Sequence, residues 1–277
     1  MTTNITPIVK WAGGKTQLLR EMTSLLPTEE FTAYCEPFLG GGAMLFYIQP
    51  EVAYINDINS GLMNVYNVIK YYPEALIAEL SGYENTAEFY SRIRELDRDF
   101  ERFSALSAVQ QAARFVYLNK TCFNGLYREN RQGQFNVSYG KYKNPNFVNA
   151  SGIRSMSQYF NSANIIFTSM DFSLVLNNLP TGTFVYLDPP YDPISETANF
   201  TSYTIYGFTK EDHIRLRECC DALTARGIKF MLSNSDTNFI RSLYAGYDIT
   251  EVFAKRFINC NGNGRGAVKE LIIRNYT

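Results

Sequence analysis

The residue types at 188–191 could hold a flat aromatic amine. Asp188, Pro189, Pro190 and Tyr191 follow directly after the apolar run 183–187, which is typical of a buried β-strand. A carboxylate accepts a hydrogen bond from an exocyclic amine, and prolines lack a backbone donor, which leaves carbonyl oxygens free to accept a second one. The ring of Tyr191 can stack on a planar base. Asp and Pro are also common turn formers, so the first three residues alone are more often an ordinary exit from a strand.

A glycine-rich turn precedes this motif by about 150 residues. The segment 33–43 is typical of a strand that turns through three glycines into a helix at 44–48, and such glycines let a ligand approach the backbone at a helix N-terminus. A second strand, 52–57, ends in Asp57, an acid well placed for the two hydroxyls of a ribose. Leu45 stands where a dinucleotide-binding turn has its third glycine, and a basic residue for a pyrophosphate is missing nearby. A nucleoside ligand without a pyrophosphate therefore fits better than NAD.

The segment 10–16 ends in Gly-Lys-Thr, which matches the tail of a P-loop. A P-loop also needs a glycine where Val9 stands, and a preceding strand for which the first ten residues leave little room. Trp11, a double glycine and Lys15 could instead form a lid over a cofactor. Taken alone, the same residues are equally typical of a helix N-terminus with a buried Trp.

Composition bounds the class of protein. The 277 residues can bury a full α/β core, and the hydrophobic fraction of 45% and charged fraction of 19% are ordinary. No apolar run approaches the roughly 18–20 residues of a membrane span, and the first ten residues do not resemble a signal peptide, so we expect a cytoplasmic protein without a membrane partner. The five cysteines lack metal-ligand spacing and His213 is the only histidine, so we expect no metal and no histidine-based catalysis.

The net charge of −1 conceals an uneven distribution. Residues 114–143 carry six basic side chains against one acid, a local balance of +5, and residues 252–277 carry five against one, a balance of +4. The remaining chain must therefore carry −10. Basic segments on an acidic body can face phosphates while the body is repelled from them, although solvated loop charge is an equal alternative for either segment alone.

Hydrophobic periodicity predicts an α/β fold. Apolar residues at three- and four-residue steps indicate helices over 58–71 and 86–118. Later strands are expected at 164–167, 183–187, 228–232 and 267–273, with helices at 209–225 and 236–244. The irregular stretch 119–145 is longer than a mere connection needs, and its five Phe and Tyr residues between positions 123 and 142 argue against disorder. We expect a mainly parallel sheet with its site at the carboxyl ends of the strands and one insertion near 60–160.

With these segments in hand, the chain resembles the Dam-type DNA adenine methyltransferases of the alpha group, which transfer a methyl group from S-adenosylmethionine to the exocyclic amine of adenine. The resemblance covers nearly the whole chain, and its individually specific stretches are 124–128, 134–137, 139–142 and 195–203. It implies a Rossmann-like S-adenosylmethionine-dependent methyltransferase sheet formed by residues 1–57 and 160–277. It also implies an inserted, mainly helical target-recognition lobe at 58–159.

The resemblance assigns roles around the cofactor and the target base. Asp188 and the Pro189 carbonyl would hold the amine of a flipped-out adenine, with Pro190 completing the motif and Tyr191 stacking on the base. Phe172 is about as well explained by a place in the core. By resemblance, the residues around S-adenosylmethionine are Trp11, Lys15, Phe38, Gly40, Asp57, Asp171, Phe172 and Asp188.

The resemblance also assigns contacts to double-stranded DNA. Phe123 would fill the gap left by the flipped base, and Arg128 would bind a guanine edge through a bidentate pair. The usual target of the family is GATC, but Ser138 stands where a proline commonly helps contact the thymine methyl, so recognition of that thymine could be relaxed. The other expected DNA contacts are Lys10 to a second guanine, Leu126 to the thymine methyl, and Asn124, Asn136, Lys141 and Tyr142 within the matching stretches.

Other functions remain open at this point. One alternative is methylation of another planar amine, such as cytosine N4, RNA adenine or a protein glutamine, although an Asp at 188 makes this less favoured. Another is a DNA-binding protein that has lost catalysis. The chain is compatible with a solitary enzyme, a phage enzyme or one half of a restriction-modification pair, in a bacterial or phage-infected cell. A monomer is expected because a palindrome can be modified one strand at a time.

Overall fold

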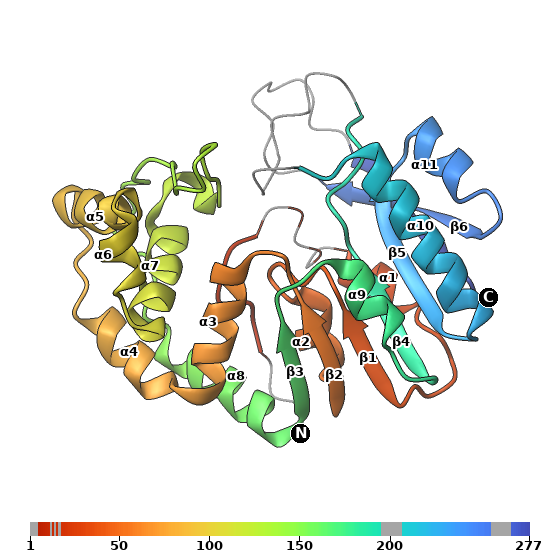
Figure 1. Cartoon of the computed structure of the whole chain (residues 1–277), viewed down its shortest axis with the longest axis horizontal. Helices are drawn as coiled ribbons and strands as arrows, with labels where there is room; N and C mark the ends of the chain where they lie inside the picture. Colours follow the sequence, from red (N-terminus) through yellow and green to blue (C-terminus); the bar gives the residue numbers. More distant parts are fainter. Residues whose placement is uncertain (1–4, 12, 14, 16–17, 195–206, 256–266) are drawn as a thin grey trace.

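A seven-stranded sheet forms the centre of the molecule (Figure 1). The computed structural model describes residues 5–11, 13, 15, 18–194, 207–255 and 267–277. The stretch 195–203, which contributed to the resemblance, lies outside these residues, as do Arg256 and Arg265 of the second basic segment. The strands are β1 Ala33–Glu36, β2 Val52–Asn56, β3 Asn164–Thr168, β4 Thr183–Leu187, β5 Lys229–Ser235, β6 Asp248–Lys255 and β7 Ala267–Arg274.

The strand order is β3-β2-β1-β4-β5-β7-β6, and β1 to β5 run parallel while β7 is antiparallel to both β5 and β6. From β1 the chain adds β2 and then β3 on one side of β1, and it then crosses back to place β4 on the other side of β1. The direction therefore reverses between β1 and β4, and the carboxyl ends at such a reversal are where open α/β sheets bind ligands. The predicted mainly parallel α/β sheet is confirmed.

Two hydrophobic clusters cover the two faces of the sheet. Alternate residues of β4 enter different clusters: Phe184 and Tyr186 face one, and Val185 and Leu187 face the other. This follows from the two-residue period of a strand, and burial on both faces explains its unbroken apolar sequence. The second cluster also contains residues of α9 Phe172–Asn177 and α10 Lys210–Ala225, which cover that face, and Figure 1 shows α10 in front of β5.

Most of the helices occur between β2 and β3 in the sequence. They lie beyond the β3 edge of the sheet, with α3 and α8 nearest to β3 (Figure 1). These helices are α3 Ser60–Tyr71, α4 Pro73–Ser81, α5 Ala87–Arg94, α6 Phe100–Ser104, α7 Ala108–Thr121 and α8 Ala150–Ser162. The remaining helices are α1 Leu19–Thr23, α2 Ala43–Ile48 and α11 Asn238–Leu243, and 3₁₀ turns occupy η2 Glu95–Arg98 and η3 Phe123–Gly125.

The helical pattern predicted over 86–118 is broken into several helices. Asp99 caps the start of α6 by accepting a hydrogen bond from the Arg102 backbone. Ser107 and Gln110 form a capping box at the start of α7. Both side chains satisfy backbone donors that a continuous helix would not leave free, so each restart is locally stabilised.

Candidate active site

The glycine turn after β1 lies against Trp11. Gly40 has a φ of +49°, and a Cβ at this position would lie 2.6 Å from Cδ1 of Trp11. A side chain cannot fit there, because heavy atoms do not approach so closely and L-residues rarely adopt this φ. The turn and Trp11, predicted as parts of one cofactor site, are therefore in direct contact. Trp11 also stacks on Tyr127, with ring centroids 5.4 Å apart.

Asp57 follows β2 and holds the glycine turn. Its Oδ2 accepts a hydrogen bond of 2.9 Å from the Gly40 backbone, and its Oδ1 accepts one of 2.9 Å from the Asn59 backbone. Burial raises the pKa of this carboxyl, while the two backbone donors act in the opposite direction. Each carboxylate oxygen can accept more than one hydrogen bond, so Asp57 keeps capacity for hydroxyl donors such as those of a ribose.

Asp188 follows β4 and is held by two donors on a single oxygen. The buried ammonium of Lys15 lies 2.9 Å from Asp188 Oδ1, and the Ser233 hydroxyl donates to the same oxygen at 2.7 Å. Lys15 also donates to the Gly13 carbonyl at 2.7 Å. Neither contact uses Asp188 Oδ2, and Asp188 is 21% exposed. Asp188 Oδ2 can therefore accept a hydrogen bond from an amine that approaches the carboxyl end of β4.

The ring of Tyr191 is held from two sides. Its hydroxyl donates to Glu270 Oε2 at 2.8 Å, and the Lys15 ammonium lies 4.5 Å from its ring centroid. Burial raises the pKa of Tyr191 well above its usual range, with the charges of Asp188 and Glu270 adding to the effect. The hydroxyl therefore stays protonated, and the ring offers a neutral, oriented surface beside Asp188. Of the two prolines between them, Pro189 is buried and Pro190 is exposed.

Phe38 and Phe172 meet beside the glycine turn. Their ring centroids are 5.4 Å apart, and both rings pack against Phe208. Phe172 is buried and belongs to the hydrophobic core. Its contact with a cofactor stays a prediction. Asp171 caps α9 through the Ser173 backbone and forms an ion pair of 2.8 Å with Arg215.

The predicted DNA-contacting residues gather where the chain leaves α7. Asn119 is fully buried there and binds the Lys10 backbone twice: its Oδ1 accepts from the Lys10 N–H at 2.7 Å, and its amide donates to the Lys10 carbonyl at 2.8 Å. Gly125 lies so close that a Cβ would sit 2.3 Å from Cδ of Lys10, and the ammonium of Lys10 lies 5.0 Å from the Tyr142 ring. This joins the segment of Trp11 and Lys15 to the inserted helices.

Phe123 and Arg128 extend from this region. Phe123 is 55% exposed, and its backbone N–H donates to the Ser138 carbonyl at 2.8 Å. The exposed Arg128 donates through Nε to Asn136 Oδ1 at 2.7 Å. The other candidates here are the exposed Asn124 and Ser138, the exposed Lys141, and the half-buried Leu126 and Tyr142. An exposed aromatic ring can contact stacked bases, and an oriented guanidinium can contact a base edge.

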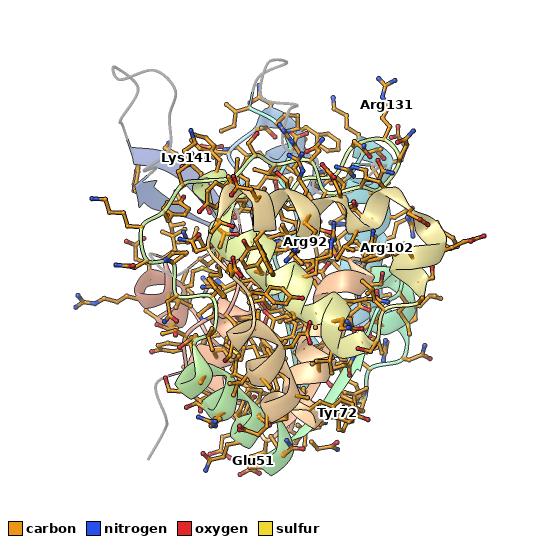
Figure 2. All side chains as sticks on the ribbon, turned by 90° about the vertical axis from the view of Figure 1, so that its left-hand side faces the viewer. Glu51, Tyr72, Arg92, Arg102, Arg131 and Lys141 are labelled. Carbon is orange, nitrogen blue, oxygen red and sulfur yellow. The ribbon has the colours of Figure 1, made fainter. Side chains whose placement is uncertain are left out.

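One member of the basic segment 114–143 does not face solvent. Arg114 is 7% exposed, and its guanidinium lies 2.6 Å from Asp97. A charge is buried only with a partner, and Asp97 from the preceding 3₁₀ turn supplies it. In contrast, Arg131, Lys141 and Lys143 are exposed, and Figure 2 shows Arg131 and Lys141 at the same end of the molecule.

Three residues that hold the candidate site were missed in the sequence. Ser233 fixes Asp188, Glu270 fixes Tyr191, and Asn119 fixes Lys10. For Ser233 the sequence held a detectable signal: the polar run Ser-Asn-Ser at 233–235 directly follows the apolar residues 230–232, and buried polar groups need partners. Glu270 and Asn119 carried no such local signal.

The described residues contain no cluster of His, Cys, Asp and Glu side chains that could hold a metal ion, and none of their helices could cross a membrane. The single histidine, His213, is buried between the rings of Phe208 and Phe239, and neither of its ring nitrogens has a hydrogen-bond partner in the described part of the chain.

Comparisons with known proteins agree on one family. Residues 11–258 match the family model of the D12 class N6 adenine-specific DNA methyltransferases. The type II methyltransferase M1.LlaDCHI of Lactococcus lactis subsp. cremoris is 44% identical over 99% of this chain and 96% of its own length. The type II methyltransferase M.MjaIII of Methanocaldococcus jannaschii is 42% identical over 98% of this chain and 99% of its own length. The DNA adenine methylase of Escherichia coli K12 is 34% identical over 95% of this chain and 93% of its own length.

These matches span nearly all of the chain, including the glycine turn, the inserted helices and the Asp188 motif. They confirm the resemblance to the adenine methyltransferases that the motifs suggested. The chain is therefore an adenine-specific DNA methyltransferase and belongs to the D12 class of the N6 adenine-specific family.

Proposed function

We infer that the chain transfers a methyl group from S-adenosylmethionine to the exocyclic N6 of a flipped-out adenine in double-stranded GATC. The observation that carries this inference is the position of Asp188 and Tyr191, which follow β4, beside the glycine turn that follows β1. Lys15 contacts both Asp188 and Tyr191, and Trp11 contacts the glycine turn at Gly40. A target base at Asp188 and a cofactor at Gly40 would thus be neighbours.

The residues around Gly40 fit S-adenosylmethionine. Gly40 offers backbone without a side chain, Asp57 has carboxylate capacity for ribose hydroxyls, and Phe38 and Phe172 offer rings for a purine. These residues take a nucleoside that lacks phosphates. The bound cofactor would supply an electrophilic methyl group on a sulfonium.

The residues of the 188–191 motif would orient the nucleophile. The lone pair of an aromatic amine is delocalised into its ring, so the amine is a weak nucleophile. Asp188 Oδ2 and the Pro189 carbonyl would accept its two N–H groups and favour a tetrahedral nitrogen, while Tyr191 stacks on the base. Positioning of this kind can account for up to about 7–11 kcal/mol of a barrier in favourable intramolecular cases.

The residues near Lys10 would recognise the DNA. The target base must leave the duplex at a cost of a few kcal/mol, and Phe123 would brace the gap. Arg128 would contact a guanine edge and Lys10 another, with Leu126 near the thymine methyl. Lys141, Asn136 and Tyr142 would contact the backbone, and residues 58–159 would form the recognition lobe. A monomer in the cytoplasm of a bacterial or phage-infected cell suffices for this reaction.

The deciding experiment is transfer of labelled methyl from S-adenosylmethionine to duplexes that carry GATC or each single-base variant, with the modified base identified by mass spectrometry. Label in N6-methyladenine confined to GATC is the expected result, and label leaking into variants of the thymine would implicate Ser138. Transfer to another sequence would reject GATC, and label in cytosine would reject the target base.

Two substitutions test the assigned roles. Asp188→Ala should abolish transfer while DNA binding by the recognition residues persists, and retained transfer would reject its catalytic role. Arg128→Ala should relax discrimination at one guanine, which is worth about 1–3 kcal/mol for a good bidentate pair. An unchanged sequence preference would reject the role of Arg128.

A further inference from the structure

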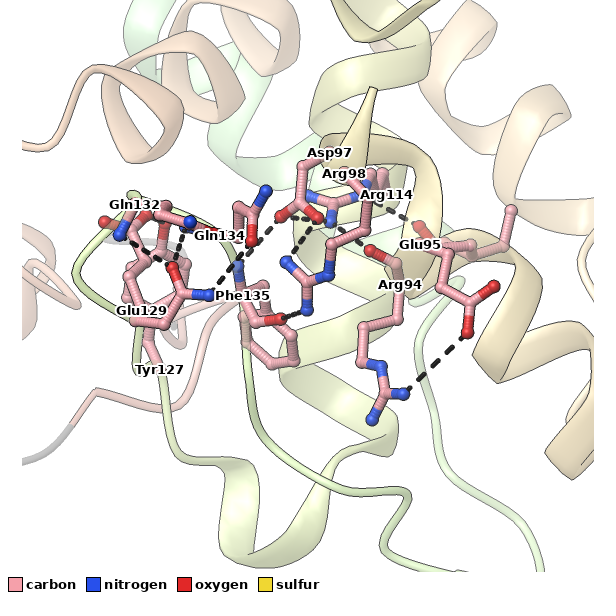
Figure 3. A network of polar contacts seen from close by, with 12 residues as sticks. Arg94, Glu95, Asp97, Arg98, Arg114, Tyr127, Glu129, Gln132, Gln134 and Phe135 are labelled. Atoms are coloured by element: carbon pink, nitrogen blue, oxygen red, sulfur yellow. Dashed lines mark hydrogen bonds and ion pairs between the residues drawn. The ribbon is translucent and has the colours of Figure 1, made fainter. Parts of the chain in front are cut away.

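A cluster of charged side chains, Asp97, Arg98 and Arg114, contacts the backbone of Phe135 (Figure 3). Asp97, whose side chain is 9% exposed, lies at its centre: Oδ2 is 2.6 Å from Nη2 of Arg114, and Oδ1 is 2.9 Å from Nη1 of Arg98. Arg114 also donates to the Ile93 and Arg94 carbonyls at 2.9 and 2.8 Å, which fixes it on α5. The two guanidiniums offset the cost of burying the carboxylate.

The cluster binds both backbone polar groups of one residue, Phe135. The Phe135 N–H donates to Asp97 Oδ2 at 2.8 Å, and Nη2 of Arg98 donates to the Phe135 carbonyl at 2.6 Å. The ring of Phe135 is 3% exposed and packs against Tyr127. Backbone and side chain are therefore held together, which leaves Phe135 little freedom to shift along the lobe.

The position of Phe135 determines that of Arg128. Phe135 forms an antiparallel bridge with Glu129, and the Asn136 N–H donates to the Arg128 carbonyl at 3.0 Å. The Asn136 side chain accepts from Nε of Arg128 at 2.7 Å. Displacing Phe135 would displace Asn136 and so the guanidinium that it orients.

We propose that Asp97 and Arg98 are positioning residues for sequence discrimination, because they hold Phe135 and thereby the guanidinium of Arg128 in register with a base edge. This inference rests on the base-contacting role proposed for Arg128. A bidentate contact to a base depends on angle as well as distance, so a loosened anchor should reduce discrimination more than affinity.

Arg98 offers the sharper test because Asp97 keeps Arg114 as its partner when Arg98 is removed. Arg98→Ala deletes the contact to the Phe135 carbonyl and leaves the buried ion pair intact. Arg102→Ala is the matched control: Arg102 is exposed on α6 (Figure 2), and within the described residues its side chain has no hydrogen bond or ion pair. The measurements are kcat/KM on GATC and on guanine-substituted duplexes, and the salt dependence of DNA binding.

The expected result for Arg98→Ala is a roughly tenfold fall in the ratio of kcat/KM between GATC and the guanine-substituted duplex. Its slope of log affinity against log salt and its KM for S-adenosylmethionine should match those of Arg102→Ala and the unchanged protein. In an Arg128→Ala background, Arg98→Ala should relax discrimination no further, since both act through one contact.

Three outcomes would overturn the inference. If Arg98→Ala keeps a strict preference for GATC while Arg128→Ala relaxes it, the positioning role of Arg98 is rejected and the base contact of Arg128 stands. Uniformly weaker binding to all duplexes with a shallower salt slope would make Arg98 a phosphate contact instead. If Arg128→Ala itself keeps its preference, the proposed base contact fails, and the inference fails with it.

Discussion

The ammonium of Lys15 lies 2.9 Å from Oδ1 of Asp188, so the residue after β4 is tied to the N-terminal segment by a largely buried ion pair. Their side chains are 5% and 21% exposed. Ser233 donates to the same carboxylate oxygen from β5. The carboxylate is thus oriented by two elements distant in sequence before any substrate arrives.

Removing either charge of this pair should destabilise the protein. Asp188→Asn leaves the buried ammonium without its counter-charge at a cost of roughly 2 kcal/mol, below the about 3–5 kcal/mol of a fully buried pair because Asp188 is partly exposed. Adding Lys15→Met should recover part of this loss but no methyl transfer. Denaturant unfolding of the two single variants and the double variant measures the coupling, and strictly additive losses would argue against it.

Substituting Ser233 should slow the reaction without weakening cofactor binding. A hydrogen bond to a charged group contributes about 1.5–3 kcal/mol, so Ser233→Ala should lower kcat by about 10- to 100-fold if the bond orients Asp188. The KM for S-adenosylmethionine should hold, and Ser233→Thr should restore part of kcat. Steady-state kinetics decide this, and an equal fall in cofactor affinity would place Ser233 in a different role.

Gly40→Ala should displace Trp11. The new Cβ would lie 2.6 Å from its ring, so the ring or the turn must move, and we expect cofactor affinity to fall at least about tenfold. Trp11 is the only tryptophan, so its fluorescence reports the displacement directly.

Gly227→Ala is the matched control for backbone strain. Gly227 has a φ of +69°, but nothing lies within 4 Å of a Cβ there. It should cost about 1 kcal/mol in stability and leave both Trp11 fluorescence and cofactor binding unchanged. Equal effects of the two substitutions on cofactor binding would contradict a specific role for the Gly40–Trp11 contact.

His213 should make stability depend on pH. Burial lowers its pKa to about 4, while the charges of Asp192 and Asp212 act in the opposite direction. In the unfolded chain the pKa of His213 is near 6.5, so the unfolded state binds more protons than the folded state between pH 4 and pH 6.5. The contribution of His213 to the free energy of unfolding is therefore fully present above pH 6.5 and is lost as the pH falls towards 4. The loss amounts to about 3 kcal/mol.

His213→Phe isolates this contribution, because His213 is the only histidine. The difference between the two unfolding profiles should open below pH 6.5, and parallel profiles would contradict the prediction. The variant should retain methyl transfer at neutral pH, since the proposed chemistry uses no imidazole.

Local sequence predicted the elements whose residues are buried on both faces. The run 183–187 became β4, and 33–36 became β1, because a central parallel strand is buried on both faces and is therefore mostly apolar. It did not predict β6 at the sheet edge, where Asp248, Glu251 and Phe253 are exposed and interrupt any regular apolar pattern. An edge strand buries only part of its surface, so its pattern is weaker.

The sequence by itself determined the family and the positions of the glycine turn and the Asp188 motif, because each depends on adjacent residue types. Only the tertiary structure decided which charges are partners. Arg114 and Arg128 belong to one basic segment, yet Arg114 is buried against Asp97 and Arg128 is exposed. Likewise, Tyr191 meets Glu270 across 79 positions of sequence. The partners of Arg114 and Tyr191 are not their neighbours in the sequence, so only the fold brings these buried groups together.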